Sequence, residues 1–247
     1  MPLSVIHFQF PDLAHIHCLF TKRNQDEIQP MDPYSGGNLS YDVGDRPKNV
    51  EENRSFLLKT HASFGLHCLA ECKQVHGSHL HFVTDNADNT ICADALATTE
   101  RNIGLCIKTA DCQAILVTDQ NGQAILSLHV GWRANRNCFI QKAIAEFCTT
   151  YALTPSRLFA VRGPSLSPQA AQFLNWQQEW PKTFHCCLDA TEKTMDLWRL
   201  SRLQLEEAGL PSKNIFGLDL CTKSNLDFFS YRRNHLCGRQ AAIIWRN

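Results

Sequence analysis

The sequence predicts an α+β fold, because segments with strand character outnumber helical segments and follow one another in runs. A regular alternation of strands and helices would instead indicate a parallel α/β sheet. The 247 residues, 44% hydrophobic and 19% charged, suit a globular protein. No internal repeat or low-complexity tract divides the chain. We therefore expect one domain over residues 1–247, built from mixed β-sheets with flanking helices.

The first segments are a loop and a helix. Residues 24–44 contain Gly36-Gly37 and two prolines, Pro30 and Pro33, and Pro47 follows nearby, which predicts a long loop. Long loops in compact domains are often functional, although a mobile surface insertion fits this composition equally well. Residues 47–58 predict a helix, because proline is favoured at the first helical position and acidic residues follow it.

The remaining segments are mostly strands. Short apolar runs predict strands, and apolar positions at helical spacing predict two helices, of which the second ends at Gly209 and Pro211. The expected strands are 68–75, 102–109, 113–118, 123–130, 215–220 and 241–245, and the expected helices are 139–151 and 194–208.

Charge and cysteine content narrow the class of function. The 24 basic residues balance 24 acidic ones, so no broad basic surface for nucleic acid is predicted. The chain shows neither a secretory signal nor the ~18 continuous apolar residues of a membrane span. The twelve cysteines are scattered and form no Cys-x-x-Cys pair. We expect a soluble, cytoplasmic protein with mostly reduced cysteines and with neither nucleic acid nor membrane as a partner.

A predicted hairpin around Asn121-Gly122 gives the first candidates for chemistry, because Asn-Gly is a strong turn signal. We expect Thr118 to pair with Gln123. In that register Cys112 lies directly opposite His129, and opposed residues have Cβ atoms ~5 Å apart on the same face. A thiolate and an imidazole so placed can share a metal ion, or can act as a nucleophile and its base.

His76 is the third candidate ligand, because it lies at the end of a predicted strand and precedes a glycine. His79 and His81 compete for this role, although alternating histidines are also common on an exposed strand edge. Two histidines and one thiolate leave the fourth position of a tetrahedral zinc ion open, which is typical of catalytic sites. We therefore predict a catalytic zinc site at His76, Cys112 and His129.

Short motifs extend from these residues along nearly the whole chain, and in their order and spacing they resemble those of a known family. They are Phe20-Thr-Lys-Arg23, Asn38-Leu39, Val43-Gly-Asp45, Asn53-Arg54, Gln74-Val-His-Gly77, Asp94-Ala95, Thr109-Ala-Asp-Cys112, His129-Val-Gly-Trp-Arg133, Gly163-Pro164, Asp196-Leu197, Cys221-Thr222, Phe228-Phe-Ser-Tyr-Arg-Arg233 and Gly238-Arg239. The family is that of the YfiH-type proteins, described as multicopper polyphenol oxidoreductases (laccase-like) and as purine nucleoside phosphorylases with adenosine deaminase activity.

The resemblance implies a single YfiH-like catalytic domain, similar in fold to toxin-type cysteine hydrolases. It implies zinc ligands at the same three positions, His76, Cys112 and His129. It also implies phosphorolysis of inosine, adenosine, guanosine or methylthioadenosine to the base and ribose 1-phosphate, together with deamination of adenosine. A nucleoside and phosphate would then be the partners of the protein.

Three departures from the family pattern bear on substrate choice more than on metal binding. Asn24-Gln25-Asp26 stands where the family usually has Gly-Gly. Ala134 ends the His-Val-Gly-Trp-Arg motif in place of glycine. Ala171-Gln172-Phe173 replaces a Tyr-Glu-Val sequence.

Phosphate binding and proton transfer need further side chains. Arginine holds phosphate through a forked pair of donors. Asp111, beside Cys112, is a candidate proton carrier, although a role as a turn or cap residue fits it slightly better. The candidates for substrate or phosphate binding are Arg54, Gln74, Arg133, Arg232 and Arg233.

Other functions remain open at this stage. A multicopper oxidase needs several copper centres, whereas the eleven histidines show one clear ligand set, so copper is kept as the alternative metal. Cys112 and His129 could instead form the active centre of a hydrolase or deamidase, or of a factor that edits peptidoglycan precursors. A binding module with a vestigial pocket is the last alternative.

Overall fold

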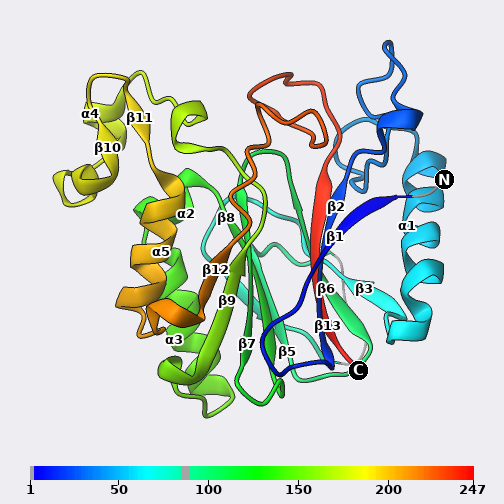
Figure 1. The fold of residues 1–247 in the computed structure, drawn as a ribbon, viewed down its shortest axis with the longest axis horizontal. Coiled ribbons are helices and arrows are strands. Elements are labelled where there is room, and N and C mark those ends of the chain that lie inside the picture. Colours follow the sequence, from blue (N-terminus) through cyan, green and yellow to red (C-terminus); the bar gives the residue numbers. More distant parts are fainter. Residues whose placement is uncertain (1–2, 85–89) are drawn as a thin grey trace.

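The computed structural model of the protein describes residues 3–84 and 90–247. In this described part of the chain, two large β-sheets pack face to face and helices cover their outer faces (Figure 1). The predicted α+β class, with mixed sheets and flanking helices, is confirmed. Among the described residues there is no helix both long enough and apolar enough to span a membrane.

The two large sheets differ in strand number and share no strand. Within the described residues, one sheet has the order β1-β2-β13-β6-β3 and the other has the order β12-β9-β7-β8-β5-β4. The strands of the first are β1 (Ser4–Phe8), β2 (Ile16–Lys22), β13 (Gln240–Arg246), β6 (Ile103–Thr109) and β3 (Cys68–Ala70). Those of the second are β12 (Ile215–Gly217), β9 (Leu158–Arg162), β7 (Gln113–Asp119), β8 (Ile125–Val130), β5 (Ala95–Thr98) and β4 (Leu80–Phe82).

The helices lie on opposite sides of this sandwich (Figure 1). On one side α1 (Pro47–His61) packs through Leu57 against the five-stranded sheet, where it meets Trp245 of β13. On the other side α2 (Trp132–Arg136), α3 (Phe139–Thr150) and α5 (Leu197–Glu207) lie on the six-stranded sheet. Burial of apolar side chains between these layers is the main term that stabilises the fold.

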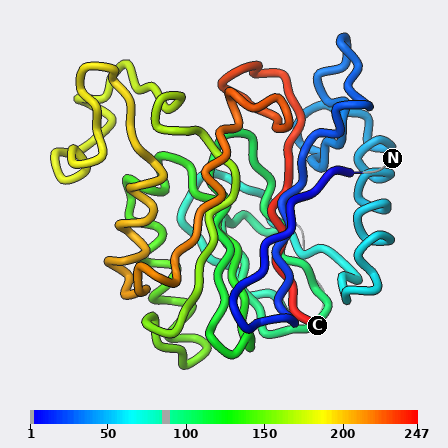
Figure 2. Tube along the Cα trace, viewed as in Figure 1, coloured from blue at the N-terminus to red at the C-terminus, as the bar shows by residue number. Residues whose placement is uncertain are grey.

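Segments from both ends of the chain meet in the five-stranded sheet. The last strand, β13, pairs with β2 on one side and with β6 on the other, antiparallel in both cases. Figure 2 shows the blue and red ends of the trace running side by side. The residues just before β13 are thereby brought beside the loop that precedes α1, where the backbone N–H of Leu39 donates to the carbonyl of Arg239.

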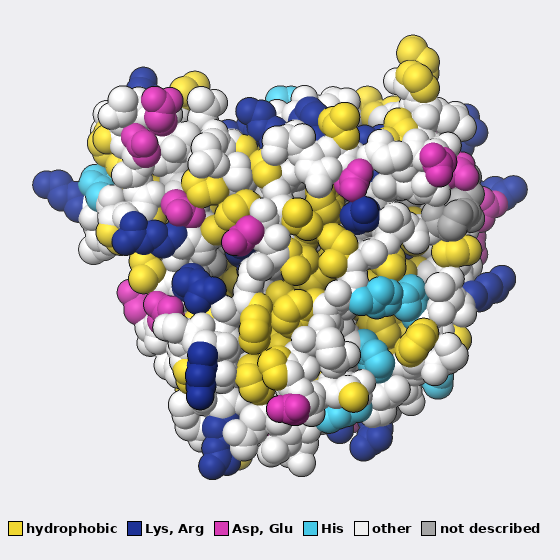
Figure 3. All heavy atoms as spheres, in the orientation of Figure 1, with side chains coloured by type: hydrophobic (Ala, Val, Ile, Leu, Met, Phe, Trp, Pro, Cys, Tyr) yellow, Lys and Arg dark blue, Asp and Glu magenta, His cyan; other side chains and the backbone are white. Residues whose placement is uncertain are grey.

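The edges of the two sheets approach each other on the face seen in Figure 3, where hydrophobic side chains gather in the middle. Phe8 of β1 contacts Phe216 of β12, with ring centroids 5.4 Å apart. Phe10 also lies beside Phe216, at 6.2 Å. These rings continue the core between the sheets out to the surface.

A smaller unit lies beside α5, at the upper left of Figure 1. It contains α4 (Trp176–Glu179) and the short hairpin of β10 (Leu188–Asp189) and β11 (Thr194–Met195). Its aromatic side chains form a separate hydrophobic cluster with Leu197 of α5.

Most of the predicted elements are present with altered ends. The helices predicted at 47–58, 139–151 and 194–208 are α1, α3 and α5, and the loop predicted at 24–44 contains only the short 3-10 helix η1 (Gln25–Glu27). The predicted strand 68–75 ends at Ala70. Residues 194–195 form β11 rather than helix, because Asp196 caps α5 by accepting a hydrogen bond from the backbone N–H of Arg199. Strands β1, β2, β4, β5, β9 and β10 are absent from the sequence prediction.

The register predicted for the central hairpin is wrong. Thr118 pairs with Ile125 and not with Gln123. The carboxylate of Asp119 is the reason, since it accepts hydrogen bonds from three backbone N–H groups between residues 121 and 124. An aspartate that satisfies several backbone donors stabilises a wider turn than the Asn-Gly pair alone would form.

The corrected register still leaves the two candidate side chains on one side of the sheet. His129 lies opposite Ala114 rather than opposite Cys112. A shift by two residues keeps every side chain on its own face, whereas a shift by one would reverse it. Cys112 therefore approaches His129 from a diagonal position.

Candidate metal centre and its cavity

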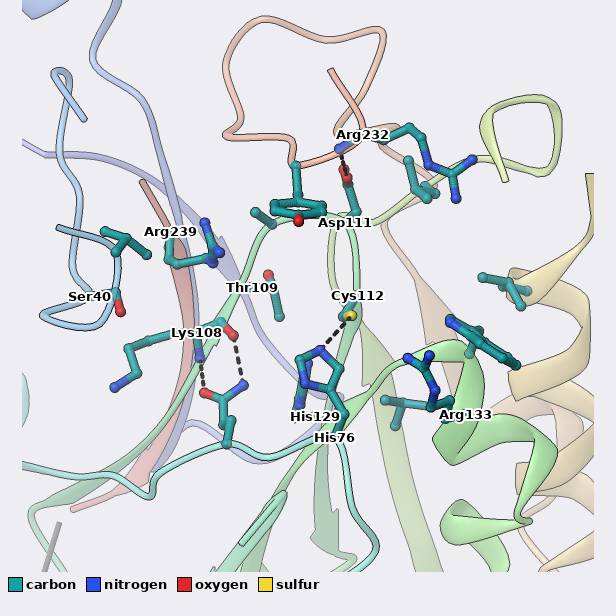
Figure 4. A pocket seen from close by; sticks show the side chains of 18 of the residues that line it. Ser40, His76, Lys108, Thr109, Asp111, Cys112, His129, Arg133, Arg232 and Arg239 are labelled. Carbon is teal, nitrogen blue, oxygen red and sulfur yellow. Dashed lines mark hydrogen bonds between the residues drawn. The ribbon is translucent and has the colours of Figure 1, made fainter. Parts of the chain in front are cut away.

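A cavity of about 600 Å³ opens where β6 and β8 end and β7 begins. Both sheets contribute to its lining, together with α2, the loop before α1 and the loop before β13. The volume lies in the range of about 300–1,000 Å³ that is typical of small-molecule sites. In Figure 4, Cys112, His76 and His129 form a group at its centre.

His76, Cys112 and His129 bring one sulfur and two imidazoles together. Their potential ligand atoms all lie within 4.8 Å of one another, and Sγ of Cys112 is 3.9 Å from Nε2 of His76. A tetrahedral zinc ion with bonds of about 2.0–2.3 Å would place such atoms about 3.5 Å apart. Small side-chain movements would therefore let all three reach one ion.

The three donors fit an open metal site. His129 is buried, Cys112 is half-buried and His76 is exposed toward the cavity, so a ligand could approach from that side. In the described part of the chain this is the one group of three or more His, Cys, Asp or Glu side chains placed to hold an ion. His79 and His81, the competing histidines, are not members of it.

Asp94 orients His129 and His76 through hydrogen bonds. It is fully buried, and its carboxylate accepts hydrogen bonds from Nδ1 of His129 at 2.7 Å and from the backbone N–H groups of His76 and Gly77 at 3.0 and 2.6 Å. Because Asp94 occupies Nδ1, the free ring nitrogen of His129 is Nε2. A carboxylate behind a metal-binding histidine fixes both the tautomer and the ring orientation.

Two residues at the site have an unusual backbone conformation. His76 has a φ of 57° and Asp111 a φ of 91°, a region that side chains other than glycine rarely adopt. The hydrogen bonds to Asp94 hold the chain around His76. Such conformations persist where the surrounding structure imposes them, and they concentrate at functional sites.

Cys112 and His129 change each other's protonation. Burial alone would raise the pKa of Cys112, but the charge of His129 and hydrogen bonds from both histidines lower it to about 6. Burial alone would lower the pKa of His129, but the Cys112 thiolate and the hydrogen bond to Asp94 raise it to about 9. The metal-free pair is thus a thiolate beside an imidazolium at neutral pH. The thiolate is the form of cysteine that binds metals and acts as a nucleophile.

The carboxylate of Asp94 stays ionised in this arrangement. Burial alone would raise its pKa, but the hydrogen bonds from His129 and from the backbone at Gly77 and His76 lower it below its usual value. The negative charge on Asp94 therefore stays available to balance a positive charge on the imidazole of His129.

Asp111, the candidate proton carrier, is nearly buried at the cavity lining. Its two carboxylate oxygens accept hydrogen bonds from the hydroxyl of Thr222 at 2.7 Å and from the backbone N–H of Arg232 at 2.6 Å. Asp111 thus joins the segment before β7 to the loop before β13. This geometry matches a turn-stabilising residue more closely than a free proton carrier.

The arginines proposed for phosphate binding fall into two groups. Arg133 and Arg232 line the cavity. Arg54 instead donates to the carbonyl of Leu39 and forms an ion pair with Glu71, with nitrogen and oxygen 2.9 Å apart. The guanidinium of Arg233 donates to backbone carbonyls of residues 222, 223 and 228. The structure therefore places these last two side chains in loop stabilisation, outside the cavity lining.

Several lining residues have no role in the sequence analysis. Gln74, which the sequence analysis does select, also lines the cavity. Its side-chain amide exchanges two hydrogen bonds, of 2.8 and 2.9 Å, with the backbone of Lys108. Lys108 and Arg239 add two cations to the lining, and Trp132 adds a large apolar surface. Trp132 and Arg239 occur in the motifs quoted above, but a motif does not tell which of its side chains turns inward.

Comparison with known proteins identifies the family. A family model described as "Multi-copper polyphenol oxidoreductase laccase" matches residues 17–247. The chain is similar to the purine nucleoside phosphorylase YfiH of Escherichia coli, with 30% identity over 87% of this chain and 88% of that protein. The chain belongs to the YfiH-type family. A purine nucleoside phosphorylase of Xylella fastidiosa is 32% identical over 99% of this chain and 97% of its own length.

Solved structures of similar proteins share the fold. The protein NMB0706 of Neisseria meningitidis superposes with a TM-score of 0.84 at 27% identity, covering 99% of both chains. YlmD of Geobacillus stearothermophilus gives a TM-score of 0.88 at 25% identity, covering 99% of this chain and 96% of its own. The YfiH-like fold expected from the motifs is confirmed. The names of the relatives identify the family as one of enzymes.

Proposed function

We propose that the protein is a zinc-dependent purine nucleoside phosphorylase that also deaminates adenosine. One observation carries the proposal: a Cys-His-His group with an open side lies at the centre of a cavity with four cationic side chains in its lining. These cations, which suit an anionic co-substrate such as phosphate, are Lys108, Arg133, Arg232 and Arg239. The names of the relatives agree with this chemistry.

His76, Cys112 and His129 would hold the zinc ion, and Asp94 would orient His129 from behind. A bound zinc ion would supply Lewis acidity and would lower the pKa of a water ligand. The donor set also suits copper, the metal named in the family description, so metal analysis of the purified protein decides between the two.

Phosphorolysis would form a bond between a phosphate oxygen and C1′ of the ribose, while the bond from C1′ to N9 of the purine breaks. The electrons of the broken bond remain on the base, which takes up a proton and leaves as the free purine. The side chains of the protein would hold the two substrates in line and balance the charge of the phosphate. Deamination would convert adenosine and water into inosine and ammonia.

The test is incubation of the purified protein with inosine or adenosine, each with and without phosphate, followed by chromatography. We expect hypoxanthine and ribose 1-phosphate from inosine only when phosphate is present, inosine from adenosine without phosphate, and about one zinc ion per chain. Cys112→Ala should give none of these products, whereas Cys68→Ser, at an exposed cysteine of β3, should match the wild type. Absence of all products with fully metal-loaded protein would refute the proposal.

A second candidate function is supported by the charge state of the site. A Cys112 thiolate, an imidazolium at His129 and the carboxylate of Asp94 form the arrangement used in nucleophilic catalysis by cysteine hydrolases and deamidases. In this case metal-free protein would release ammonia from amide substrates. Activity that survives chelation of all metal would favour the hydrolase over the phosphorylase.

A further inference from the structure

The cavity has two chemically different walls on opposite sides of the central group. We define the polar wall by Ser40, Gln74, Lys108 and Arg239, and the aromatic wall by Trp132, Leu166, Phe173 and Leu197. Figure 4 places Ser40, Lys108 and Arg239 on one side of Cys112 and Arg133 on the other. Arg133 marks the side of the aromatic wall, because its guanidinium lies over the Trp132 ring at 4.4 Å from the centroid.

The aromatic wall is a packed surface and not a set of loose side chains. Trp132 contacts Phe173 and Trp180, with ring centroids 5.8 and 6.0 Å apart, and those two rings lie 5.3 Å from each other. Trp180 is almost fully buried behind them. A purine has a large, flat, weakly polar face that stacks well on such rings. The wall is therefore suited to a base.

The polar wall contains an arginine that is held in place before any ligand binds. Nη1 of Arg239 donates to the carbonyls of Cys237 and Gly238 at 2.8 and 2.9 Å. These bonds use one of the two terminal nitrogens, so N–H donors of the guanidinium fork are left for a ligand. A side chain that is already ordered loses little conformational freedom on binding. In Figure 4 the hydroxyl of Thr109 lies between this guanidinium and Cys112.

The charges behind this wall leave it positive. Glu71 is shared by two cations, Arg54 at 2.9 Å and Lys108 at 3.0 Å, and is itself nearly buried. Asp42 is 3.9 Å from the amine of Lys108, but its side chain is 73% exposed, so solvent screens it. With Arg239 added, cations exceed carboxylates by one on this side of the cavity.

We propose that the phosphate co-substrate binds at Arg239 on the polar wall, while the purine stacks on the aromatic wall near Arg133. This assignment rests on the proposed function and specifies its two subsites. Opposite walls suit in-line displacement, because phosphate then approaches C1′ from the face opposite the departing base. A β-nucleoside would accordingly give the α-anomer of ribose 1-phosphate.

The first test separates the two walls by steady-state kinetics with inosine. Arg239→Met should raise the KM for phosphate at least tenfold and change the KM for inosine less than threefold, since losing a charge-assisted fork costs about this much. Arg133→Met should show the reverse, a higher KM for inosine with a nearly unchanged KM for phosphate. Arg101→Gln, an exposed arginine outside the cavity lining, serves as the matched control.

A variant that is expected to lower the KM for phosphate controls for misfolding, because a misfolded protein would not show a lower KM. Asp42→Asn removes the exposed carboxylate near Lys108, so it should lower the KM for phosphate about two- to threefold and leave the KM for inosine unchanged. A higher phosphate KM in Arg133→Met than in Arg239→Met, or no effect of Asp42→Asn, would overturn the assignment even if the enzyme is an active phosphorylase.

Direct binding distinguishes failure of the subsites from failure of the proposed function. Calorimetric titration with inorganic phosphate alone should show binding to the wild type that Arg239→Met loses and Arg133→Met keeps. If no nucleoside is turned over but this pattern is found, the anion site stands and the proposed function fails. If the wild type turns over inosine and Arg239→Met still binds phosphate normally, the function stands and the subsite is wrong.

Discussion

The two sides of the cavity are built in different ways. On the side of the six-stranded sheet, Cys112 and His129 stand at strand ends, and Trp132 follows within the same short segment. On the side of the five-stranded sheet, Lys108 forms ion pairs with Asp42 of the loop before α1 and with Glu71 after β3. The backbone of Arg239 is hydrogen-bonded to the same loop. The positions of Cys112 and His129 are thus fixed by sheet geometry, whereas the polar wall depends on charge. The two sides should respond differently to mutation, pH and salt.

The largest effect is expected from removing a donor on the sheet side. Cys112→Ala or His129→Ala should abolish both zinc binding and turnover, because two remaining ligands hold zinc poorly. The fold should persist, since apolar packing between the layers does not involve these side chains. Metal analysis, circular dichroism and the inosine assay measure this together. Wild-type turnover in either variant would disprove the role of the centre.

The next largest effect is expected from changing Asp94, which is hydrogen-bonded to His129 and to the backbone of His76. Asp94→Asn keeps the shape of the side chain but weakens its hold on His129 and on the backbone at His76. Loss of such a partner typically lowers metal affinity 10- to 100-fold, so we expect a change of about this size in a competition titration with a zinc chelator. Glu71→Gln, behind the polar wall, is the comparison and should leave zinc affinity unchanged. Equal losses in both variants would mean that the two sides are not independent.

The pH dependence of alkylation sharpens the contrast within the metal-free protein. The pKa of Cys112 is lowered to about 6, so this thiol is already a thiolate at pH 7. Its reaction with iodoacetamide should change less than about twofold between pH 7 and 8.5, whereas an ordinary thiol would react about tenfold faster per pH unit below its pKa. Cys72, with a pKa raised by burial to about 12, should remain unmodified. A steadily rising rate at Cys112 would contradict the ion pair with His129.

The smallest effect is expected on the KM for phosphate when the salt concentration is raised. Because charge holds the polar wall, the KM for phosphate should rise about two- to threefold between 0.05 and 0.5 M potassium chloride, as the screening length falls below 10 Å. Zinc content and the KM for inosine should stay constant over the same range. Equal salt dependence of both KM values would indicate that the nucleoside also depends on this wall.

The sequence predicts the proximity of Cys112 and His129 more reliably than it predicts their surroundings, for a physical reason. The two-residue period of a strand puts Cys112 and His129 on one face even though the predicted register is off by two. Asp94 cannot be assigned in this way, because its hydrogen bond to His129 joins residues 35 positions apart in different strands and loops. Its role appears only when the strands are assembled.

The arginines show the limit of motif-based prediction. Arg233 and Arg239 belong to neighbouring motifs and have the same chemistry. Nearby carbonyls capture the guanidinium of Arg233 outside the cavity, whereas carbonyls beside Arg239 hold its side chain at the lining. Local backbone geometry decides which carbonyls each guanidinium reaches. Neither composition nor motif spacing predicts that geometry.

The position of β13 has a consequence for synthesis of the protein. This strand inserts between β2 and β6, so the halves of its sheet remain unjoined until residues 240–246 have left the ribosome. His76, Cys112 and His129 precede residue 239 in the chain, so they are translated before the arginine that faces them. A nascent chain would therefore expose a nucleophilic sulfur without its completed enclosure, and chaperones or early metal capture would have most effect during that interval.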